Sequence, residues 1–356
     1  MKEKLLMKGN EVIAEAAIRA GCRYYFGYPI TPQTEISHYM AKKIPELGGV
    51  FLQAESEIAA INMVYGTAST GKRVMTSSSS PGISLKQEGL SYMAGAELPA
   101  VVVNIVRCGP GLGGILPSQG DYFQSVKGGG HGDYKMIVYA PFSIQELYEL
   151  TVKAFDVADK YRIVSMIMGD GILGQMMESI EFKEEEKIIN YDKSWATTGT
   201  EMKRERNIIT SIHLDPNVLE SLNNRLFKKY KIIEEEEYMA EEYNCDNADI
   251  IIVAYGTVAR IAESIVKEEE FGKFKVGLIR PITLWPFPSK ILKKYNPKAF
   301  LTVEMSLGQM VEDVKLSVND RDKVLFYGRT GGNIPTHKDI VNEIYKIIEK
   351  YNKTGT

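Results

Sequence analysis

The strongest constraint on the fold is a regular alternation of short apolar runs with longer amphipathic stretches in the first half of the chain. The apolar runs are rich in β-branched and aromatic residues, and apolar residues then recur at helical spacing. The runs predicted as strands cover residues 22–26, 50–53, 74–76, 100–106, 136–139 and 163–168. Six alternations within about 175 residues predict a doubly wound parallel sheet wrapped by helices.

A second, shorter alternation begins near residue 249. Its predicted strands cover residues 250–254, 276–279, 300–303 and 324–327, and its predicted helices cover residues 258–268, 289–295, 308–317 and the stretch from 336. A chain of 356 residues exceeds one ordinary core. We therefore assign residues 1–180 to the parallel-sheet domain and residues 248–356 to a smaller α/β domain.

The segment between these domains, residues 181–247, is charged and irregular. It contains the acidic runs Glu184–Glu186 and Glu234–Glu237. A helix is predicted over residues 215–230, because Asp215 is placed to cap it and apolar residues follow at helical spacing. We interpret the segment as a connecting arm whose acidic runs are solvated faces, with a tail that binds a basic partner as the alternative.

Composition excludes several functional classes. A formal net charge of −3 disfavours nucleic acid and acidic membrane surfaces, which select a basic excess. No run of about 18 apolar residues occurs, and the start at Met1–Lys4 lacks an apolar signal core, so we expect a cytoplasmic protein. Three distant cysteines (Cys22, Cys108 and Cys245) and four scattered histidines predict neither disulfides nor a metal or iron-sulfur site in this chain.

The most distinctive stretch runs from Tyr28 to Glu57. Thr31 is the predicted cap of a helix and Pro32 its predicted first residue, because the missing proline N–H would be unpaired there anyway. Glu57 follows the next strand and opens another helix, so both positions lie where open parallel sheets bind ligands. Glu55 competes with Glu57 for this role, and a simple N-terminal helix acid is the alternative for either.

Two further turns are candidates for ligand contact. Ser77–Ser80 join a strand to a helix predicted from about Ile83, which favours a turn that faces a ligand over a linker. A glycine-rich loop of about 25 residues follows Arg107, and its anchoring by Tyr122 and other apolar residues favours a functional loop over disorder.

Other local patterns predict packing and helix ends. Asn10 is placed to cap the first helix and Gly21 to end it. Ser143–Glu146 has the pattern of a full capping box. The stretch Arg280–Pro288 holds three prolines and two aromatic residues, which is typical of a packing or subunit surface.

Familiar cofactor signatures are missing from the chain. There is no G-x-G-x-x-G after the first strand and no Walker lysine loop, which disfavours a Rossmann-type nucleotide enzyme. Gly169-Asp170-Gly171 superficially resembles a magnesium-pyrophosphate motif, but Asn190 is too close to be its asparagine. We interpret Asp170 as an acid at a strand end.

Four motifs, in order along the chain, carry a resemblance to a known family. They are Tyr28-Pro29-Ile30-Thr31-Pro32, Gln53–Gly66, Ser79–Gly89 and Arg107–Gly113. Together they resemble the 2-oxoacid:ferredoxin oxidoreductases, and most closely the pyrimidine-type thiamine-domain subunit of the 3-methyl-2-oxobutanoate (2-ketoisovalerate) enzymes. The resemblance runs from Gly9 to about Gly174 and resumes in the second domain, so it covers most of the chain.

The resemblance implies an α/β fold with a pyrimidine-type thiamine-diphosphate-binding domain and a smaller transketolase C-terminal-like domain. It implies that Glu57 bonds N1′ of the aminopyrimidine, a role that suits a carboxylic acid in an apolar turn. It places Thr31 and Arg107 near the carboxylate and carbonyl of the substrate. The implied cofactor contacts are Tyr28, Pro29, Ile30, Glu57, Ser80, Pro81 and Gly82.

Two positions depart from the pattern of the resembled family. Ser80 stands where glycine is usual before Pro-Gly and adds a Cβ to that turn. Gly169-Asp170-Gly171 replaces the usual Asp-Ala. Neither departure removes a catalytic group.

The resemblance also implies partner subunits, since the pyrophosphate-binding half of a thiamine site is absent from the sequence. Thiamine diphosphate would be shared with a pyrophosphate-binding subunit, with Mg²⁺ and iron-sulfur clusters on partners that include gamma-type and ferredoxin-like subunits, and coenzyme A as co-substrate. The apolar loop Leu112–Pro117 favours branched-chain 2-oxoacids over 2-oxoglutarate, with pyruvate between. A non-catalytic scaffold subunit is the alternative function.

Overall fold

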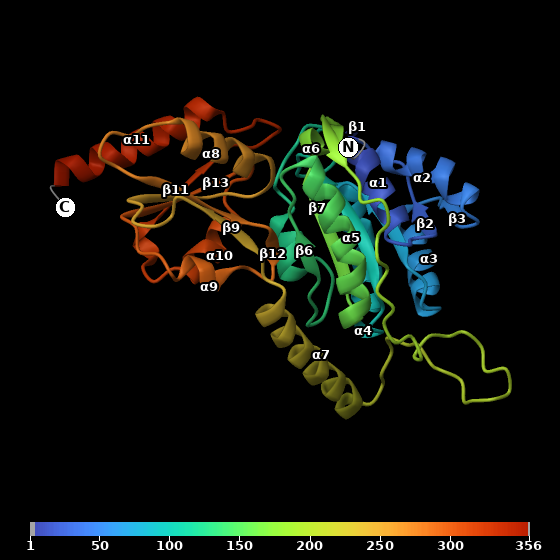
Figure 1. Ribbon diagram of the computed structural model, residues 1–356. Coiled ribbons are helices and arrows are strands. Elements are labelled where there is room, and N and C mark those ends of the chain that lie inside the picture. The colour runs from blue at the N-terminus through green and yellow to red at the C-terminus, as the bar shows by residue number, and fades with distance from the viewer. Residues whose placement is uncertain (1–3, 355–356) are drawn as a thin grey trace.

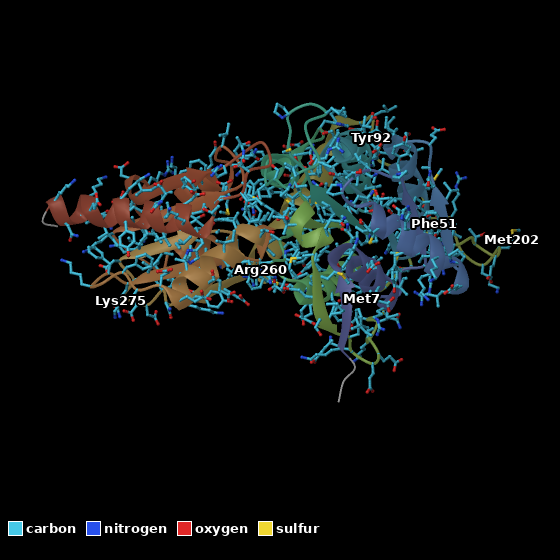
Figure 2. The ribbon with its side chains drawn as sticks, turned by 90° about the horizontal axis from the view of Figure 1, so that it is seen from above. Met7, Phe51, Tyr92, Met202, Arg260 and Lys275 are labelled. Atoms are coloured by element: carbon cyan, nitrogen blue, oxygen red, sulfur yellow. The ribbon has the colours of Figure 1, made fainter. Side chains whose placement is uncertain are left out.

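The computed structural model describes residues 4–354, which form two α/β units that lie side by side (Figure 1). The first unit is built on a seven-stranded sheet and the second on a five-stranded sheet. A long helix, α7 (Pro216–Glu236), packs below their junction, and the extended segment that precedes it projects from the first unit, with Met202 near its tip (Figure 2).

The first sheet has the strand order β12-β6-β7-β5-β4-β2-β3. Its parallel strands are β2 (Tyr24–Gly27), β3 (Val50–Gln53), β4 (Val74–Ser78), β5 (Ala100–Val106), β6 (Ile137–Tyr139) and β7 (Val164–Asp170). The predicted doubly wound parallel sheet is confirmed. Every residue of β4, β5 and β7 is buried, which explains their almost continuous apolar runs.

Helices cover both faces of this sheet. They are α1 (Gly9–Arg19), α2 (Thr34–Glu46), α3 (Glu57–Ser69), α4 (Ser80–Gly95), α5 (Ile144–Tyr161) and the short α6 (Gly171–Gln175). The helix α1 packs on α2 and α5, whereas α3 packs on α4. The chain steps from β2 out to the edge strand β3 and then returns past β2 to β4. With the usual right-handed crossover connections, this change of direction puts the two groups of helices on opposite faces of the sheet.

The second sheet has the order β14-β13-β10-β11-β9. Its strands are β9 (Ala240–Tyr243), β10 (Ile250–Val253), β11 (Val276–Pro281), β13 (Ala299–Glu304) and β14 (Val324–Gly328). Its helices are α8 (Gly256–Glu268), α9 (Ser289–Leu292), α10 (Met310–Ser317) and α11 (His337–Thr354). All four predicted strands are confirmed; β9, which was not predicted, pairs antiparallel with β11.

The proline-rich stretch after β11 joins the two units. Its strand β12 (Thr283–Trp285) leaves the second unit and pairs antiparallel with β6 at the edge of the first sheet. The prediction that this stretch is a packing surface is confirmed. The first sheet is therefore completed by a strand that lies more than a hundred residues downstream.

Several predicted helix starts are wrong. Asn10 does not cap α1, which begins at Gly9; its buried amide instead donates to Pro32 O (2.8 Å) and Glu35 Oε2 (2.8 Å). Thr31 and Pro32 lie before α2, which begins at Thr34, because the Pro32 carbonyl accepts from Asn10 rather than from a helical turn. The helix predicted from about Ile83 begins earlier, at Ser80.

Two further strands, β1 (Lys4–Lys8) and β8 (Met177–Glu181), were not predicted. Near the N-terminus, β1 pairs antiparallel with β8, where the sequence predicts only a polar lead into the first helix. Both strands lie largely on the surface, and neither shows the long apolar run of the central strands.

The capping box predicted at Ser143–Glu146 is only half formed. Ser143 Oγ accepts from Glu146 N (3.2 Å), but the Glu146 carboxylate accepts from Phe142 N (3.0 Å) instead of from Ser143. It also receives two bonds from Arg280 of β11, from Nη1 (2.9 Å) and Nη2 (2.6 Å). The long-range ion pair draws the glutamate away from the local cap.

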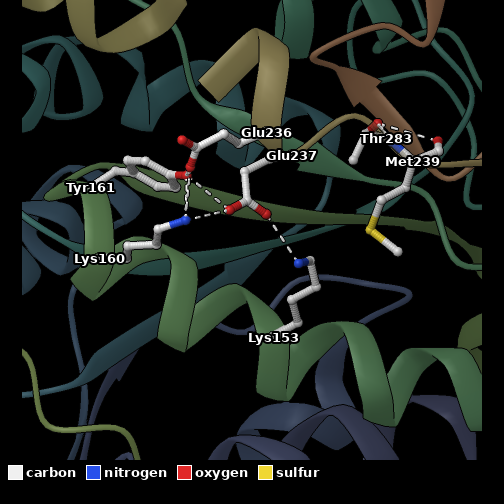
Figure 3. A network of polar contacts seen from close by, with 7 residues as sticks. All are labelled: Lys153, Lys160, Tyr161, Glu236, Glu237, Met239 and Thr283. Atoms are coloured by element: carbon white, nitrogen blue, oxygen red, sulfur yellow. Dashed lines mark hydrogen bonds and ion pairs between the residues drawn. The ribbon is translucent and has the colours of Figure 1, made fainter. Parts of the chain in front are cut away.

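In the acidic run at the end of α7, Glu235 and Glu236 are exposed as predicted for a solvated face, whereas Glu237 departs from that prediction. Glu237 is buried and accepts from Lys153 Nζ (3.0 Å), Lys160 Nζ (3.1 Å) and the Tyr161 hydroxyl (3.0 Å), all on α5 (Figure 3). Lysines on α5 and acids on α7 are thus complementary, which fixes the helix against the first unit. Asp215 caps α7 as predicted and accepts from Asn217 N (2.8 Å).

A buried arginine and a glutamine connect the two units. The side chain of Arg280 has no exposed surface and pairs with Glu146 and Glu241, while its guanidinium lies 3.8 Å from the ring centre of Phe142. Gln119 of the long loop donates to Tyr255 O (2.9 Å) and accepts from Met305 N (2.8 Å) in the second unit. Arg260 lies at the same junction (Figure 2). The long glycine-rich loop is therefore held between the units.

We expect Arg280→Met to lower the free energy of unfolding by about 3 kcal/mol, because Glu146 would keep a partly buried charge without its partner. Denaturant titration of the purified chain measures this change. The matched control is Lys203→Met, whose exposed pair with Glu201 contributes at most about 0.5 kcal/mol. Equal stability of the two variants would contradict the role of Arg280 as a clamp between the units.

Candidate active site

The candidate site lies at the edge of the first sheet where β2, β3, β4 and β5 end. The register aligns Gly27 with Gln53 and Ser78 with Asn104, so the turns after these strands converge. Such edges are where open parallel sheets bind ligands. The predicted residues Thr31, Glu57, Ser80 and Arg107 each follow one of these strands.

Glu57 is the nearly buried acid of this edge. It is the first residue of α3, which Ser56 caps by accepting from Ala59 N (3.1 Å). Its exposed fraction is 5%, whereas Glu55 is exposed, so burial distinguishes Glu57 from the competing acid Glu55. Among the described residues, no donor forms a hydrogen bond to the Glu57 carboxylate. A nearly buried acceptor without a donor is suited to an external N–H.

Gly82, in the first turn of α4, allows that helix to approach Glu57 closely. A Cβ on Gly82 would lie 2.0 Å from Ser78 Oγ and 2.5 Å from Glu57 Oε1. Any side chain larger than hydrogen would therefore displace the carboxylate. The Pro81-Gly82 motif is required here by the packing of α4 against α3.

Ser80 connects the turn after β4 to the turn after β5. Its hydroxyl accepts from Arg107 N (3.0 Å) and donates to Arg107 O (3.1 Å), and its N–H donates to Asn104 Oδ1 (3.2 Å). Asn104 in turn donates to Asp121 Oδ2 (2.9 Å) on the long loop. The serine that departs from the usual glycine thus forms part of the framework of the site.

Arg107 brings the loop after β2 to the same place. Its Nη1 donates to Thr31 O (3.1 Å) and its Nη2 donates to Leu112 O (3.1 Å), while Nε is buried and has no partner among the described residues. The Thr31 side chain is exposed at the surface of the loop. Arg107 therefore links the loop after β2 to the loop after β5, and its Nε remains unpaired.

The loop from Tyr28 to Gln33 is fixed from below by a buried polar chain. The Tyr25 hydroxyl bonds Ser37 Oγ (2.7 Å) and Ser77 Oγ (2.6 Å), and Ser77 also donates to Gln33 Oε1. Gln33 then donates to Tyr28 O (3.3 Å). The position of the loop is thus set by side chains that the sequence patterns did not single out.

Unpaired polar atoms cluster under this edge. Ser78 Oγ, Ser79 Oγ, Lys86 Nζ and Arg107 Nε are buried without a hydrogen-bond partner among the described residues. Burial lowers the pKa of the Lys86 ammonium to about 8, and the charge of Glu57 opposes part of that lowering. Burial raises the pKa of the Asp121 carboxyl, while bonds from Asn104 and Ser80 act in the opposite sense.

The rim of the site is apolar and open to solvent. The exposed fractions of Leu112, Ile115 and Leu116 are 83%, 60% and 55%, and that of Tyr28 is 37%. These exposed apolar side chains, and the unpaired polar atoms beneath them, indicate that the site is not complete in the single chain. The residues present can hold an N–H donor at Glu57, and they supply hydroxyls and a guanidinium beside it.

Comparison with known proteins identifies this arrangement. The family described as "Pyruvate flavodoxin/ferredoxin oxidoreductase, thiamine diP-bdg" matches residues 15–242, and "Pyruvate:ferredoxin oxidoreductase core domain II" matches residues 248–340. The chain belongs to the 2-oxoacid:ferredoxin oxidoreductase family. It is 50% identical over 349 residues to the ketoisovalerate oxidoreductase subunit VorB of Methanothermobacter marburgensis, covering 98% of this chain and 99% of that one.

Other members of this oxidoreductase family are more distant. The 2-oxoglutarate synthase subunit KorA of Methanocaldococcus jannaschii is 36% identical, covering 92% of this chain and 95% of that one. A solved 2-oxoglutarate:ferredoxin oxidoreductase from Magnetococcus marinus superposes with a TM-score of 0.87 and 27% identity, over 98% of this chain and 66% of that one. A split-gene transketolase, at 12% identity and a TM-score of 0.57, shares the fold. The predicted family and fold class are confirmed.

Two structural features are absent from the described part of the chain. In residues 4–354 no helix is both long and apolar enough to cross a membrane. Within the same range no group of three His, Cys, Asp or Glu residues is arranged to hold a metal ion.

Sequence reasoning missed four residues of this candidate site. They are Gln33, Lys86, Asn104 and Asp121, of which Gln33, Lys86 and Asn104 are fully buried. Asn104 interrupts an otherwise apolar strand, and Lys86 interrupts the buried face of α4, so a polar residue at an apolar position was the available signal. Gln33 and Asp121 lie in loops, where polar residues are ordinary.

We expect Gly82→Ala to destabilise the chain by about 1–3 kcal/mol, because the new methyl group overlaps Ser78 and Glu57. The matched control is Gly66→Ala in α3, where a Cβ would meet nothing within 4 Å and should stabilise the helix by up to about 1 kcal/mol. Thermal or denaturant unfolding compares the two variants. Stabilisation by both would contradict the close contact of α4 with Glu57.

Proposed function

We propose that this family member is the subunit that supplies the pyrimidine half of a thiamine diphosphate site in an oxidoreductase that oxidatively decarboxylates 3-methyl-2-oxobutanoate and related branched-chain 2-oxoacids. The products are the acyl-CoA and carbon dioxide, and ferredoxin is reduced. The single observation that carries the proposal is Glu57, a nearly buried carboxylate that has no donor in the described chain. The family description of a thiamine-diphosphate-binding domain supports the same cofactor.

Each residue of the edge has a separate role in this proposal. Thiamine diphosphate, when bound, supplies the nucleophilic carbon that adds to the substrate and takes up the electrons left by decarboxylation. Glu57 accepts a hydrogen bond from the pyrimidine nitrogen and holds or releases a proton there. Arg107 lies near the substrate carboxylate, and Thr31 contacts the substrate from the loop that Arg107 bonds.

The remaining contacts position the ring of the cofactor. Tyr28, Pro29 and Ile30 form one wall, and Ser80, Pro81 and Gly82 form the other. The Ser80 bonds to Arg107 keep both walls at a fixed separation. Rigid positioning of this kind is worth a substantial part of the barrier in enzymatic reactions.

The choice of substrate rests on the apolar rim. Leu112, Ile115 and Leu116 are exposed at the mouth of the site, and residues 112–117 contain no cation that would pair with a second substrate carboxylate. The relatives named for ketoisovalerate are 50% identical to this chain, whereas those named for 2-oxoglutarate are 33–37% identical. Pyruvate and 2-oxoglutarate specificity are the alternatives within the same family.

The exposed and incomplete site supports an assembly with other chains. We propose that a pyrophosphate-binding thiamine-domain subunit covers the edge, and that Mg²⁺ and iron-sulfur clusters are held by that subunit and by gamma-type and ferredoxin-like partners. Coenzyme A is the acyl acceptor, a choice supported by the Magnetococcus marinus relative, which was solved with coenzyme A and succinyl-CoA bound. The assembly is assigned to the cytoplasm. Within this chain, residues 1–180 and 248–356 are its two domains and residues 181–247 its connecting arm.

A non-catalytic scaffold subunit is the competing function. A scaffold has no need for a nearly buried carboxylate without a donor, nor for an arginine Nε left unpaired beside it. Of these two features, the buried and unpaired Nε imposes a cost on folding, because buried polar groups are normally hydrogen-bonded. Their presence together favours a site that a bound molecule completes.

We expect Glu57→Gln to lower thiamine-dependent viologen reduction by about a hundredfold or more in the complex co-expressed with its partner subunits, because an amide cannot exchange the proton that a carboxylic acid can. Glu55→Gln is the control, since Glu55 is exposed and lies two residues away. Unchanged turnover by Glu57→Gln would exclude the proposed role of this acid. Turnover by the chain alone would exclude the shared site.

The same complex should discriminate among 2-oxoacids. We expect kcat/KM for 3-methyl-2-oxobutanoate to exceed that for 2-oxoglutarate by at least about tenfold, because an apolar rim leaves a second carboxylate unpaired. Steady-state assays with equal coenzyme A measure this ratio, with pyruvate as the intermediate case. A preference for 2-oxoglutarate would show that the apolar rim does not select the substrate.

A further inference from the structure

Lys86 on α4 is a buried cation that has no part in the site as described so far. Its side chain is fully buried, and its Nζ has no hydrogen-bond partner among the described residues. A lysine in this state is rare, because an unpaired ammonium loses its hydration without compensation. The packing of α4 against α3 indicates which residues Lys86 faces.

The positions of three residues on α4 place Lys86 beside Glu57. Gly82, Lys86 and Gly89 are spaced four and three residues apart, so they lie on one face of the helix. A Cβ on Gly82 would touch Glu57 Oε1 at 2.5 Å, and one on Gly89 would touch Ile61 Cγ2 at 2.6 Å. Glu57 and Ile61 are one turn apart on α3, so Lys86 lies on the face of α4 that packs against these two residues.

Several other titratable groups lie around α4. On the packed elements these are Tyr65 on α3, Asp170 at the end of β7, and Asp121, His131 and Tyr134 on the long loop, while β5 contributes none. Glu88 and Tyr92 lie on α4 itself and bond each other. Among the described residues, Glu57 is the charged group that acts on the Lys86 ammonium.

We propose that Lys86 is a positioning residue for Glu57: its buried ammonium, on the face of α4 that packs against α3, compensates the charge of the Glu57 carboxylate and ties the use of that carboxylate to the protonation of the lysine. The two charges compensate each other in a region that excludes water, where a charge interaction is stronger than at the surface. This inference rests on the proposed function for the catalytic importance of Glu57. The coupling of Lys86 with Glu57 does not depend on the proposed function.

The consequence is a dependence on alkaline pH. The pKa of Lys86 in the folded chain is about 8, below the ordinary value of 10.5, because burial disfavours its charged form. As the pH rises through about 8 the lysine loses its proton, and the Glu57 carboxylate loses its compensating charge. Binding of thiamine diphosphate to the complex should therefore weaken above that pH.

Stability changes in the opposite direction. Below about pH 8 both folded and unfolded chains carry the Lys86 proton, and burial of the charge penalises the folded state in full. Between about 8 and 10.5 only the unfolded chain keeps the proton, so the penalty shrinks as the pH rises. Lys86→Met removes the penalty, so this variant should fold and should exceed the wild type in stability at about pH 7.

The first experiment is a lysine NMR titration of the full chain, with the Lys86 signal assigned from Lys86→Met. We expect a midpoint near 8 that moves to lower pH by about one unit in Glu57→Gln, because the stabilising negative charge is gone, and that stays in place in Glu55→Gln. An identical midpoint in the wild type and in Glu57→Gln would overturn the proposal.

The second experiment measures thiamine diphosphate affinity of the assembled complex by calorimetry from about pH 6.5 to about pH 9.5. The wild type should lose affinity above about pH 8, whereas Lys86→Met should bind more weakly than the wild type at about pH 7 and show no such loss. Equal affinities and equal pH profiles would overturn the proposal. Full turnover by Glu57→Gln would count against the proposed function of Glu57, while the NMR titration alone decides its coupling to Lys86.

Discussion

The close contact between the first turn of α4 and the start of α3 is the constraint on which the site depends. Gly82 lies against the Glu57 carboxylate at a distance that no Cβ would permit. This packing buries the acid without giving it a donor, and it encloses Lys86 between the same helices. The Lys86 ammonium is buried without a hydrogen-bond partner in the described chain, which raises the free energy of the chain on its own.

The contact between α4 and α3 lies where the ends of several strands converge. Four parallel strands end at one edge, so turns that are distant in sequence meet there. Ser80 and Arg107 then fix the separation of those turns through a pair of backbone bonds, and Arg107 reaches the loop that carries Thr31. The departure from glycine at Ser80 is compensated by the bonds that its hydroxyl makes.

The second unit lies outside the site but helps to position the loop at the rim of the site. The long loop that carries Leu112 and Asp121 is held by Gln119, which bonds the backbone of the second unit at Tyr255 and Met305. The strand β12 and the buried Arg280 fix the same junction. The loop that forms the rim of the site is therefore positioned partly by its bonds to the second unit.

The sequence by itself determined the parallel sheet, the family and the turns that carry Thr31, Glu57, Ser80 and Arg107, because strand periodicity and local motifs are encoded over short distances. It misplaced the cap at Asn10 and the start of α2, missed β12 as part of the first sheet, and could not show that Glu57 is buried while Glu55 is exposed. Only the tertiary structure decided these points, together with the burial of Lys86. Each depends on which distant atoms compete for a hydrogen bond or exclude water, and no local pattern records that competition.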